Sequence, residues 1–286
     1  MHKRNEIFID VLESVNLLVS ATGSVLRSDV TGVIKMNTRL TGMPECKFGL
    51  NDKLMLDKDG SSAAAAARGG KGESSRLCAP LDGCSFTFVV LFAGGIEIDD
   101  VSFHRCVQLG KFEADRTITF VPPDGEFELA KYRVTDGVNL PFRVLPVIEE
   151  REGHVSMNVK VVGNFNANLN ASNVVLKIPT PPSTARARIT TSLGRAKYEP
   201  AQRAVVWRLK KFPGGAEVTL NAEVELISVT KKKPWSRPPI AVEFQVTMFT
   251  ASGLHVRSLK VYERSNYETT KWVKYSTRAG QYQIKV

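Results

Sequence analysis

The chain has 286 residues, of which 43% are hydrophobic and 24% are charged, and its formal charge is +10. These values are typical of a globular protein with one large domain or two smaller ones. No apolar run is long enough to cross a bilayer, the first residues do not resemble a signal peptide, and the four cysteines lack CxxC spacing, so we expect a cytosolic protein without a zinc site or disulfides.

The first predicted element is a strand over the segment RNEIFIDVLESVNLL, Arg4 to Leu18. A helix is the alternative, but the Ile, Val and Phe content favours a strand. The pleat of a strand would place Phe8 and Asp10 on one face and Ile7 and Ile9 on the other. A buried, unpaired carboxylate is costly, so Asp10 either faces solvent or receives a hydrogen-bond donor from a ligand.

Residues 57–83 interrupt the strand pattern with an Ala-, Gly- and Ser-rich segment that has no apolar face. Such a composition buries too little surface to offset the entropy of ordering, and we expect a disordered surface loop. The apolar segment that follows, CSFTFVVLFAGG, fits either an added strand or an insertion, and the sequence leaves both open.

The rest of the chain predicts short strands separated by turns. Apolar and polar residues alternate in HVSMNVKVVGNF, NVVLKIPTP, EVTLNAEVELISV and AVEFQVTMF. Turn signals stand between them at PPDGE, FPGG and RPP. The pattern is typical of an all-β protein built from β-sandwiches.

No catalytic pattern is present. The four histidines, His2, His104, His154 and His255, are scattered, and no HExxH, GxSxG, Walker A or GxGxxG motif occurs. The acidic pair Asp99 and Asp100 is more typical of a solvated strand end than of a metal site. We expect a binding protein, not an enzyme, with no cofactor and no metal.

Several segments together resemble the mu homology domain of clathrin adaptor medium subunits. They are NEIFIDVLESVNLL, TGMPECKFGLNDK, FHRCVQLGKF, FVPPDGEFELAKYR, LPFRVLPVIEE, GRAKYEP, RPPI, FTASGLHVRSLKV and KWVKYSTRAGQYQIKV. The resemblance covers nearly the whole chain except residues 57–95. YRVTDGVNLPFRVLP, KPWSRPPI and KWVKY are most similar to the medium subunit of the plasma-membrane adaptor, adaptor complex two.

The resemblance implies an elongated all-β fold of two β-sandwich subdomains, the second inserted into the first. Residues 1–137 and 248–286 would form subdomain A, and residues 138–247 the inserted subdomain B. It also implies that a full family member carries an amino-terminal longin-like domain ahead of this region.

The family's medium subunits bind an extended cargo tail carrying Tyr-x-x-Φ, where Φ is a bulky apolar residue. The resemblance places Phe8, Asp10, Asn37, Trp272 and Lys274 in the tyrosine pocket. Phe8 would stack on the cargo tyrosine, Asp10 would accept its hydroxyl proton and Trp272 would cover the ring. Taken singly, Phe8 and Trp272 are more often core residues, so this prediction depends on their joint occurrence.

Two pocket positions depart from the family pattern. Lys274 stands where adaptor complex two has Arg, and Lys cannot stack as a planar guanidinium does. Asn37 stands where the family has a cation, and Lys35, two residues away on the same strand face, is the residue that would compensate. The predicted Φ pocket keeps its apolar character, with Ile7, Ile9, Val256, Leu259 and Val273.

A second predicted site binds phosphatidylinositol bisphosphate, as the basic patch on subdomain B of the plasma-membrane medium subunit does. The matching residues are Lys3, Arg4, Arg195, Lys197 and Arg208. Glu199 replaces a Lys of the pattern, while Lys210, Lys211 and the run at 231–233 would add to the field. The alternative is a solvated basic surface without a ligand.

The sequence therefore predicts a cargo-sorting module in clathrin-mediated endocytosis. Its partners would be Tyr-x-x-Φ tails, the other subunits of a heterotetrameric adaptor, and phosphoinositide membrane at plasma-membrane coated pits, or at the trans-Golgi or endosome for a different adaptor. The alternative is a medium-subunit-like scaffold of another coat with an altered tyrosine pocket. A nucleic-acid-binding β protein is disfavoured, because KKKPW and RLKKF have an aromatic residue at one end only.

Overall fold

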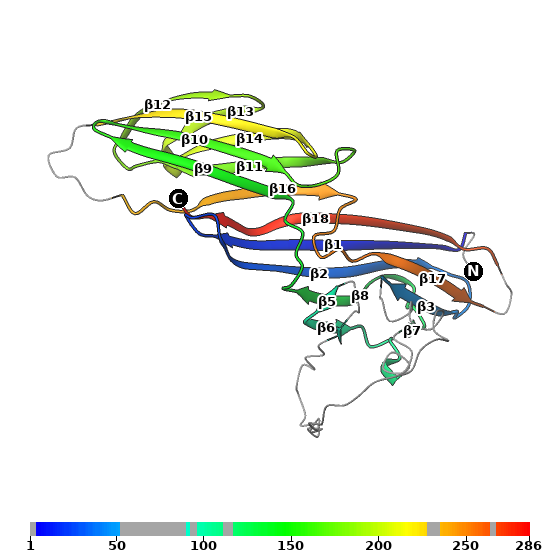
Figure 1. The fold of residues 1–286 in the computed structure, drawn as a ribbon. Coiled ribbons are helices and arrows are strands. Elements are labelled where there is room, and N and C mark those ends of the chain that lie inside the picture. Colours follow the sequence, from blue (N-terminus) through cyan, green and yellow to red (C-terminus); the bar gives the residue numbers. More distant parts are fainter. Residues whose placement is uncertain (1–3, 52–89, 92–95, 111–116, 228–234, 264–266) are drawn as a thin grey trace, which may run out of the picture.

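The computed structural model describes residues 4–51, 90–91, 96–110, 117–227, 235–263 and 267–286. The predicted loop at 57–83 and most of the apolar segment after it lie outside these residues. The molecule is elongated and all-β, as predicted (Figure 1). No helix in the described ranges is both long and apolar enough to span a membrane.

One nine-stranded sheet runs the length of the molecule. Its strands, in spatial order, are β13 (Arg195–Glu199), β14 (Ala204–Pro213), β11 (Asn170–Pro179), β16 (Ile240–Thr247), β18 (Thr270–Ile284), β1 (Glu6–Val19), β2 (Val25–Arg39), β8 (Gly125–Val134) and β6 (Asp100–Phe103). β1 and β18 run parallel over most of their length, and the other neighbouring pairs are antiparallel.

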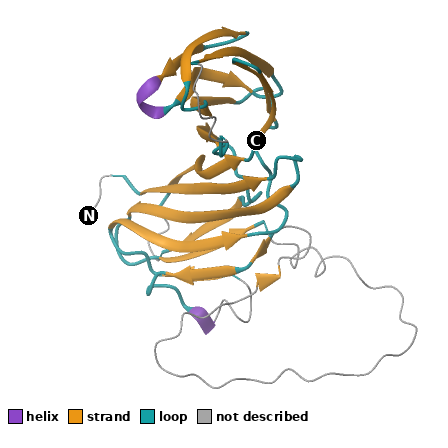
Figure 2. Ribbon diagram, turned by 90° about the vertical axis from the view of Figure 1, so that its left-hand side faces the viewer, coloured by secondary structure: helices purple, strands orange, loops and turns teal. Residues whose placement is uncertain are grey.

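Separate smaller sheets accompany the two ends of the long sheet, and Figure 2 shows the resulting two β units, one above the other. One sheet contains β12 (Thr184–Thr191), β15 (Glu217–Leu226), β10 (His154–Gly163) and β9 (Phe142–Arg151). Another contains β17 (Val256–Tyr262), β3 (Glu45–Leu50) and β7 (Ile118–Phe120). The remaining elements are a two-stranded sheet of β4 (Val90–Leu91) and β5 (Glu97–Ile98), and the short 3-10 helix η2 (Pro200–Gln202).

The strands β9 to β16 are consecutive in sequence and form the upper unit in Figure 1, so the second sandwich is inserted into the first, as predicted. The boundaries at 137/138 and 247/248 stay a prediction. The chain returns from the insertion through residues 248–255, which connect β16 to β17.

The upper unit has an aromatic core. The ring of Phe142 lies 5.1 Å from that of Phe212 and 5.0 Å from that of Phe244, measured between centroids. Tyr282, near the end of β18, packs edge-on against Phe244, and its hydroxyl donates to the carbonyl oxygen of Phe142. Because β18 also pairs with β1, this contact couples the long strands to the inserted sandwich.

β1 is a strand, as its β-branched content predicts, and its buried and less buried residues alternate with period two. Its most unusual buried residue is Glu13, which is only 1% exposed. The carboxylate accepts hydrogen bonds from Tyr132 Oη at 2.8 Å, from the backbone N–H of Ala251 at 2.5 Å, and from Ser252. Glu13 therefore anchors the returning segment that leads into β17.

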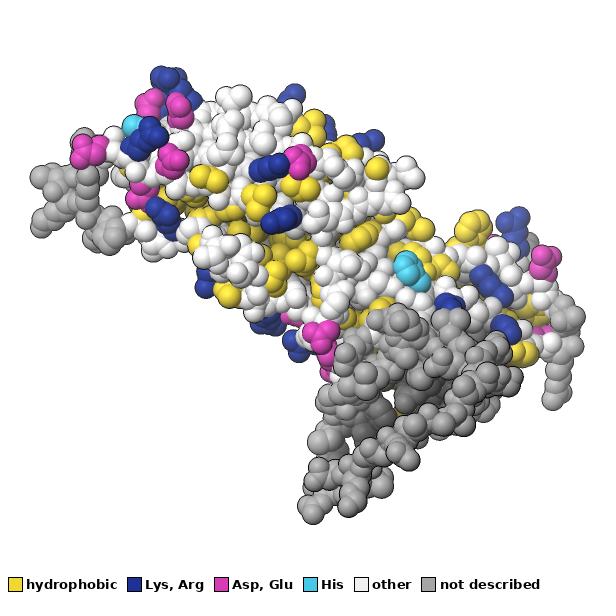
Figure 3. All heavy atoms as spheres, viewed as in Figure 1, with side chains coloured by type: hydrophobic (Ala, Val, Ile, Leu, Met, Phe, Trp, Pro, Cys, Tyr) yellow, Lys and Arg dark blue, Asp and Glu magenta, His cyan; other side chains and the backbone are white. Residues whose placement is uncertain are grey.

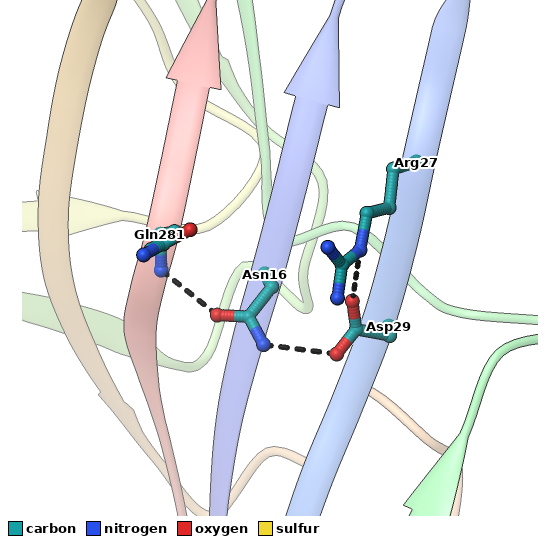
Figure 4. Close-up of polar contacts among 4 residues, drawn as sticks. All are labelled: Asn16, Arg27, Asp29 and Gln281. Atoms are coloured by element: carbon teal, nitrogen blue, oxygen red, sulfur yellow. Dashed lines mark hydrogen bonds and ion pairs between the residues drawn. The ribbon is translucent and has the colours of Figure 1, made fainter.

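A bulge in β18, where one extra residue lies between Ala279 and Tyr282, shifts the register of this strand with β1 between Val15 and Leu17. Asn16 lies at this bulge: its Oδ1 accepts the backbone N–H of Gln281, and its Nδ2 donates to Asp29 of β2 (Figure 4). Arg27 Nε donates to the same carboxylate at 2.9 Å. These contacts satisfy polar groups that the bulge would leave unpaired.

Candidate functional site

The strand register brings the predicted tyrosine-pocket residues together on one face of the long sheet. Phe8 of β1 lies opposite Trp272 of β18 on one side and Asn37 of β2 on the other. One step along the strands, Asp10 lies between Lys274 of β18 and Lys35 of β2. Side chains opposite each other on neighbouring strands have Cβ atoms within about 4.5–5.5 Å.

This face is accessible. The side chain of Trp272 is 58% exposed, Lys274 is exposed, and Phe8, Asp10 and Asn37 are partly buried. Within the described part of the chain, the Asp10 carboxylate has no hydrogen-bond or ion-pair partner. A half-buried carboxylate beside two aromatic rings is thus available to accept a hydrogen bond from a ligand.

Asn37, one of the two departures from the family pattern, and Lys35, the residue expected to compensate for it, behave differently. Lys35 Nζ lies 3.6 Å from the carboxylate of Glu126 on β8, so part of its charge is already compensated. Asn37 Oδ1 is buried and has no hydrogen-bond partner among the residues that the structure describes, an arrangement that proteins avoid unless a water or ligand completes it.

The predicted Φ-pocket residues lie on the opposite side of the same strands. Ile7 and Ile9 are 0% and 1% exposed and belong to the hydrophobic core, and Val273 lies opposite Ile9 in the register. Leu259 of β17 belongs to the same core, which extends through both units, and Val256 packs against it.

Side-chain bonds hold β17 against this inner side of β18. Lys271 Nζ donates to the carbonyl oxygen of Leu259 at 2.6 Å, and the N–H of Val256 donates to Tyr275 Oη at 3.0 Å. Val273 lies between Lys271 and Tyr275 on the same strand face, so it is directed toward β17. A ligand side chain would reach this apolar cluster only by passing the edge of β18.

That edge is open in the described structure. β18 pairs with β1 from Thr270 onward, whereas its pairing with β16 begins only at Ser276, opposite Thr247. In the described residues, no strand pairs with the second edge of Thr270 to Lys274. Trp272 and Lys274 are within this open stretch, so the polar face, the apolar cluster and an unpaired strand edge meet at one place.

The predicted phosphoinositide residues divide into two groups. Arg195 lies directly opposite Arg208 in the β13–β14 pair, and Lys197 is on the same face and exposed. Arg4 precedes β1 at the far end of the molecule from β13 (Figure 1), and Lys3 lies outside the described residues, as do 231–233. The structure therefore supports one cluster on the inserted sandwich rather than a single patch of all five residues.

Glu199 contributes an ion pair that reduces the charge of that cluster. Its carboxylate lies 2.9 Å from Arg208 Nη2 and also accepts a hydrogen bond from Gln202. Lys210 and Lys211, which follow Arg208 on β14, are also exposed. On the face drawn in Figure 3, Lys and Arg are spread over both units and are not confined to one patch.

The described residues contain no cluster of three or more His, Cys, Asp or Glu side chains able to hold a metal ion. Sequence reasoning did not find the open edge of β18, the unpartnered Asn37 Oδ1 or the ion pair of Arg208. To predict the open edge, one must know how strands that are distant in sequence pair. To predict the state of Asn37 and of Arg208, one must know the register of the paired strands.

A model of the adaptor complexes medium subunit family matches residues 1–286. The chain belongs to this family. Its relatives include AP-2 complex subunit mu of Dictyostelium discoideum, 51% identical over 289 residues, and AP-2 complex subunit mu of Schizosaccharomyces pombe, 40% identical over 288 residues. Each match covers 100% of this chain but only 62% and 61%, respectively, of those proteins.

Solved mu homology domains have the same fold at low sequence identity. The yeast delta-COP-I mu-homology domain matches with a TM-score of 0.64 at 13% identity, covering 100% of both chains. The Fcho1 mu homology domain of Danio rerio, solved with a bound Eps15 peptide, matches with a TM-score of 0.60 at 12% identity, covering 99% of this chain and 98% of that one. At these identities the likeness shows that the chain has the mu homology fold.

Proposed function

We propose that this domain of a clathrin adaptor medium subunit binds Tyr-x-x-Φ sorting signals in the cytoplasmic tails of membrane proteins. The observation that carries the proposal is the register, which sets Phe8 beside Trp272 and leaves the neighbouring Asp10 carboxylate without a partner in the described ranges of the chain. The tyrosine ring would lie against Phe8 and Trp272, and its hydroxyl would donate to Asp10. Buried aromatic contacts of this kind add about 0.5–1.5 kcal/mol beyond the area they remove from water.

The open edge of β18 would receive the backbone of the tail. An extended peptide that adds to a sheet edge gains main-chain hydrogen bonds, and its alternate side chains fill pockets on either side. With the tyrosine on the Trp272 face, the Φ side chain would reach past the edge toward Val273, Val256 and Leu259. This accounts for Ile7 and Ile9, which would line the floor of the Φ pocket from within the core and need not be exposed.

The proposal is tested with a fluorescent Tyr-x-x-Φ peptide and two matched variants. Asp10→Ala is expected to weaken binding at least tenfold, since a charge-assisted hydrogen bond contributes about 1.5–3 kcal/mol, whereas Asp136→Ala, at an exposed loop position, should leave affinity unchanged. A peptide with N-methylated backbone amides at the two x positions should also bind weakly if the edge is used. Equal affinity of the wild-type protein and Asp10→Ala would refute the pocket assignment.

A second proposed activity is contact with phosphoinositide membrane through the cluster of Arg195, Lys197 and Arg208. Each cation near an anionic leaflet contributes about 1 kcal/mol, and the pairing of Glu199 with Arg208 lowers that sum. Together the two activities would place the domain peripherally at plasma-membrane coated pits, in a heterotetramer with other adaptor subunits.

One observation favours the alternative, a medium-subunit-like scaffold of another coat with an altered tyrosine pocket. Asn37 replaces a cation, and its Oδ1 has no partner within the described structure, so the pocket differs from the family pattern beside Phe8. A folded protein that binds phosphoinositide vesicles but no tyrosine peptide would favour this alternative.

A further inference from the structure

A separate pocket of about 340 Å³ lies in the inserted sandwich. It is formed where the end of β11, the turn from η2 into β14, and the segment Trp235 to Pro239 ahead of β16 meet. None of the residues assigned above to tyrosine, Φ or phosphoinositide binding lines it. The proposed cargo and membrane sites therefore leave this pocket without a role.

The wall of the pocket is mostly apolar and rich in proline. It contains Trp235 and the prolines Pro179, Pro182, Pro238 and Pro239. The pyrrolidine ring holds the backbone φ angle of each proline near −65°. Little conformational freedom remains to be lost when a ligand enters, and such preorganisation increases affinity.

Two polar groups at the pocket have no partner in the described part of the chain. Thr180 is 3% exposed and its Oγ1 makes no hydrogen bond, although its backbone N–H donates to the carbonyl oxygen of Arg203 at 2.9 Å. The guanidinium of Arg203 forms neither a hydrogen bond nor an ion pair. A buried hydroxyl without a partner costs about 1–3 kcal/mol, so a ligand acceptor at this place would remove an existing penalty.

The backbone of Arg203 is also unusual. Its φ is +48°, in the left-handed region that non-glycine residues rarely adopt. Glycine would occupy this conformation with less strain, yet the position carries an arginine whose side chain contacts no described acid. This conformation caps the C-terminal end of η2, where the N–H of Arg203 donates to the carbonyl oxygen of Pro200, so the arginine stands at a defined turn beside the pocket.

The charge of the lining fits an anionic ligand. Lys177 and Arg203 line the pocket, and no Asp or Glu does. Lys177 is already bound to Glu243 at 2.6 Å, so among the described lining residues Arg203 is the cation without an acidic partner. An acceptor between Arg203 and Thr180 would satisfy both groups at once.

We propose that this pocket binds an acidic protein segment in which a carboxylate side chain stands next to a large apolar one. The carboxylate accepts hydrogen bonds from Arg203 and Thr180, and the apolar side chain packs on Trp235 and the proline wall. A phosphoinositide headgroup has no apolar group to fill that wall, so the lining favours a peptide. The pocket is thus a second docking site, on the inserted sandwich and independent of the tyrosine pocket.

The test uses the indole N–H signals of the chain's three tryptophans in nitrogen-15 NMR spectra, with Trp235 assigned from Trp235→Phe. The probes are the dipeptides N-acetyl-Asp-Phe-amide and N-acetyl-Asn-Phe-amide, which differ only in the carboxylate. The Asp probe is expected to shift the Trp235 signal with saturation in the millimolar range. The Asn probe should bind about tenfold more weakly, the ratio for the loss of one charge-assisted hydrogen bond.

The matched variants separate recognition from folding. Arg203→Gly removes the guanidinium while easing the left-handed backbone, so the fold is retained and the Asp probe should lose about tenfold in affinity. Thr180→Val keeps the shape of the side chain and removes the hydroxyl, and should lose severalfold. Arg143→Ser removes an exposed cation on β9 and is expected to change nothing.

Three results would overturn the proposal. They are equal affinity for the Asp and Asn probes, unchanged affinity of Arg203→Gly, and displacement of the Asp probe from Trp235 by inositol trisphosphate, which would assign the pocket to a lipid headgroup. Binding of the tyrosine peptide is followed by the signal of Trp272, and its loss would concern only the tyrosine pocket. Each of the two proposals can therefore be refuted without the other.

Discussion

Replacing the buried Glu13 by Ala is expected to lower the free energy of unfolding by about 4 kcal/mol. Tyr132 Oη and the backbone N–H of Ala251 would be left without an acceptor among the described residues, and the N–H and hydroxyl of Ser252 would lose their bonds to the same carboxylate. Each buried donor left unsatisfied costs about 1–3 kcal/mol. Thr277 adds little, because its hydroxyl can donate to the carbonyl oxygen of Phe249 at 2.7 Å instead.

Urea denaturation followed by tryptophan fluorescence measures this loss, and a fall of about 8–16 °C in Tm is its thermal equivalent for a chain of this size. Glu13→Gln is the matched control. Its amide oxygen can still accept the Ala251 N–H, while its amide nitrogen faces the hydroxyls of Tyr132 and Ser252, which can rotate to accept. We expect Gln to cost less than half as much as Ala, and a loss below about 1 kcal/mol for Ala would refute the assigned role.

Three further predictions concern the fold and the basic cluster. Gly32→Ala places a Cβ atom 2.0 Å from the ring of Tyr132, so we expect a destabilisation of several kcal/mol in the same urea assay, and a neutral result would contradict the packing. Glu199→Gln releases Arg208 and should increase the affinity for phosphoinositide vesicles about fivefold at low salt, as measured by co-sedimentation. Glu149→Gln makes the same charge change on β9 and should leave that affinity unchanged. Burial raises the pKa of the Cys46 thiol to about 12, so iodoacetamide at pH 8 should leave Cys46 unmodified in peptide maps until urea is added.

Local patterns were sufficient to predict the strand β1 and the direction of its side chains. The alternation of Ile7, Phe8, Ile9 and Asp10 is a property of the pleat, and it is confirmed by the burial of the two isoleucines. The all-β class followed in the same way from period-two segments and turns. Family resemblance, not periodicity, supplied the inserted topology.

Features that depend on the register could not be predicted. The open edge of β18 arises because β16 pairs only with the second half of that strand, a long-range contact that no local pattern encodes. The ion pair of Glu199 with Arg208 depends on the hairpin register of β13 and β14. The pocket beside Trp235 joins three segments that are far apart in sequence.

The central claim is tested most directly by isothermal titration of the domain with a Tyr-x-x-Φ peptide and with its Tyr-to-Phe and Tyr-to-Ala counterparts. The account predicts micromolar affinity for the first peptide. It predicts a large loss for Phe, because a site built to bond a hydroxyl leaves the Asp10 carboxylate unpaired without it, and no binding for Ala. Equal affinity for all three peptides, or no binding by the folded domain, would contradict a tyrosine-signal pocket at Phe8, Asp10 and Trp272.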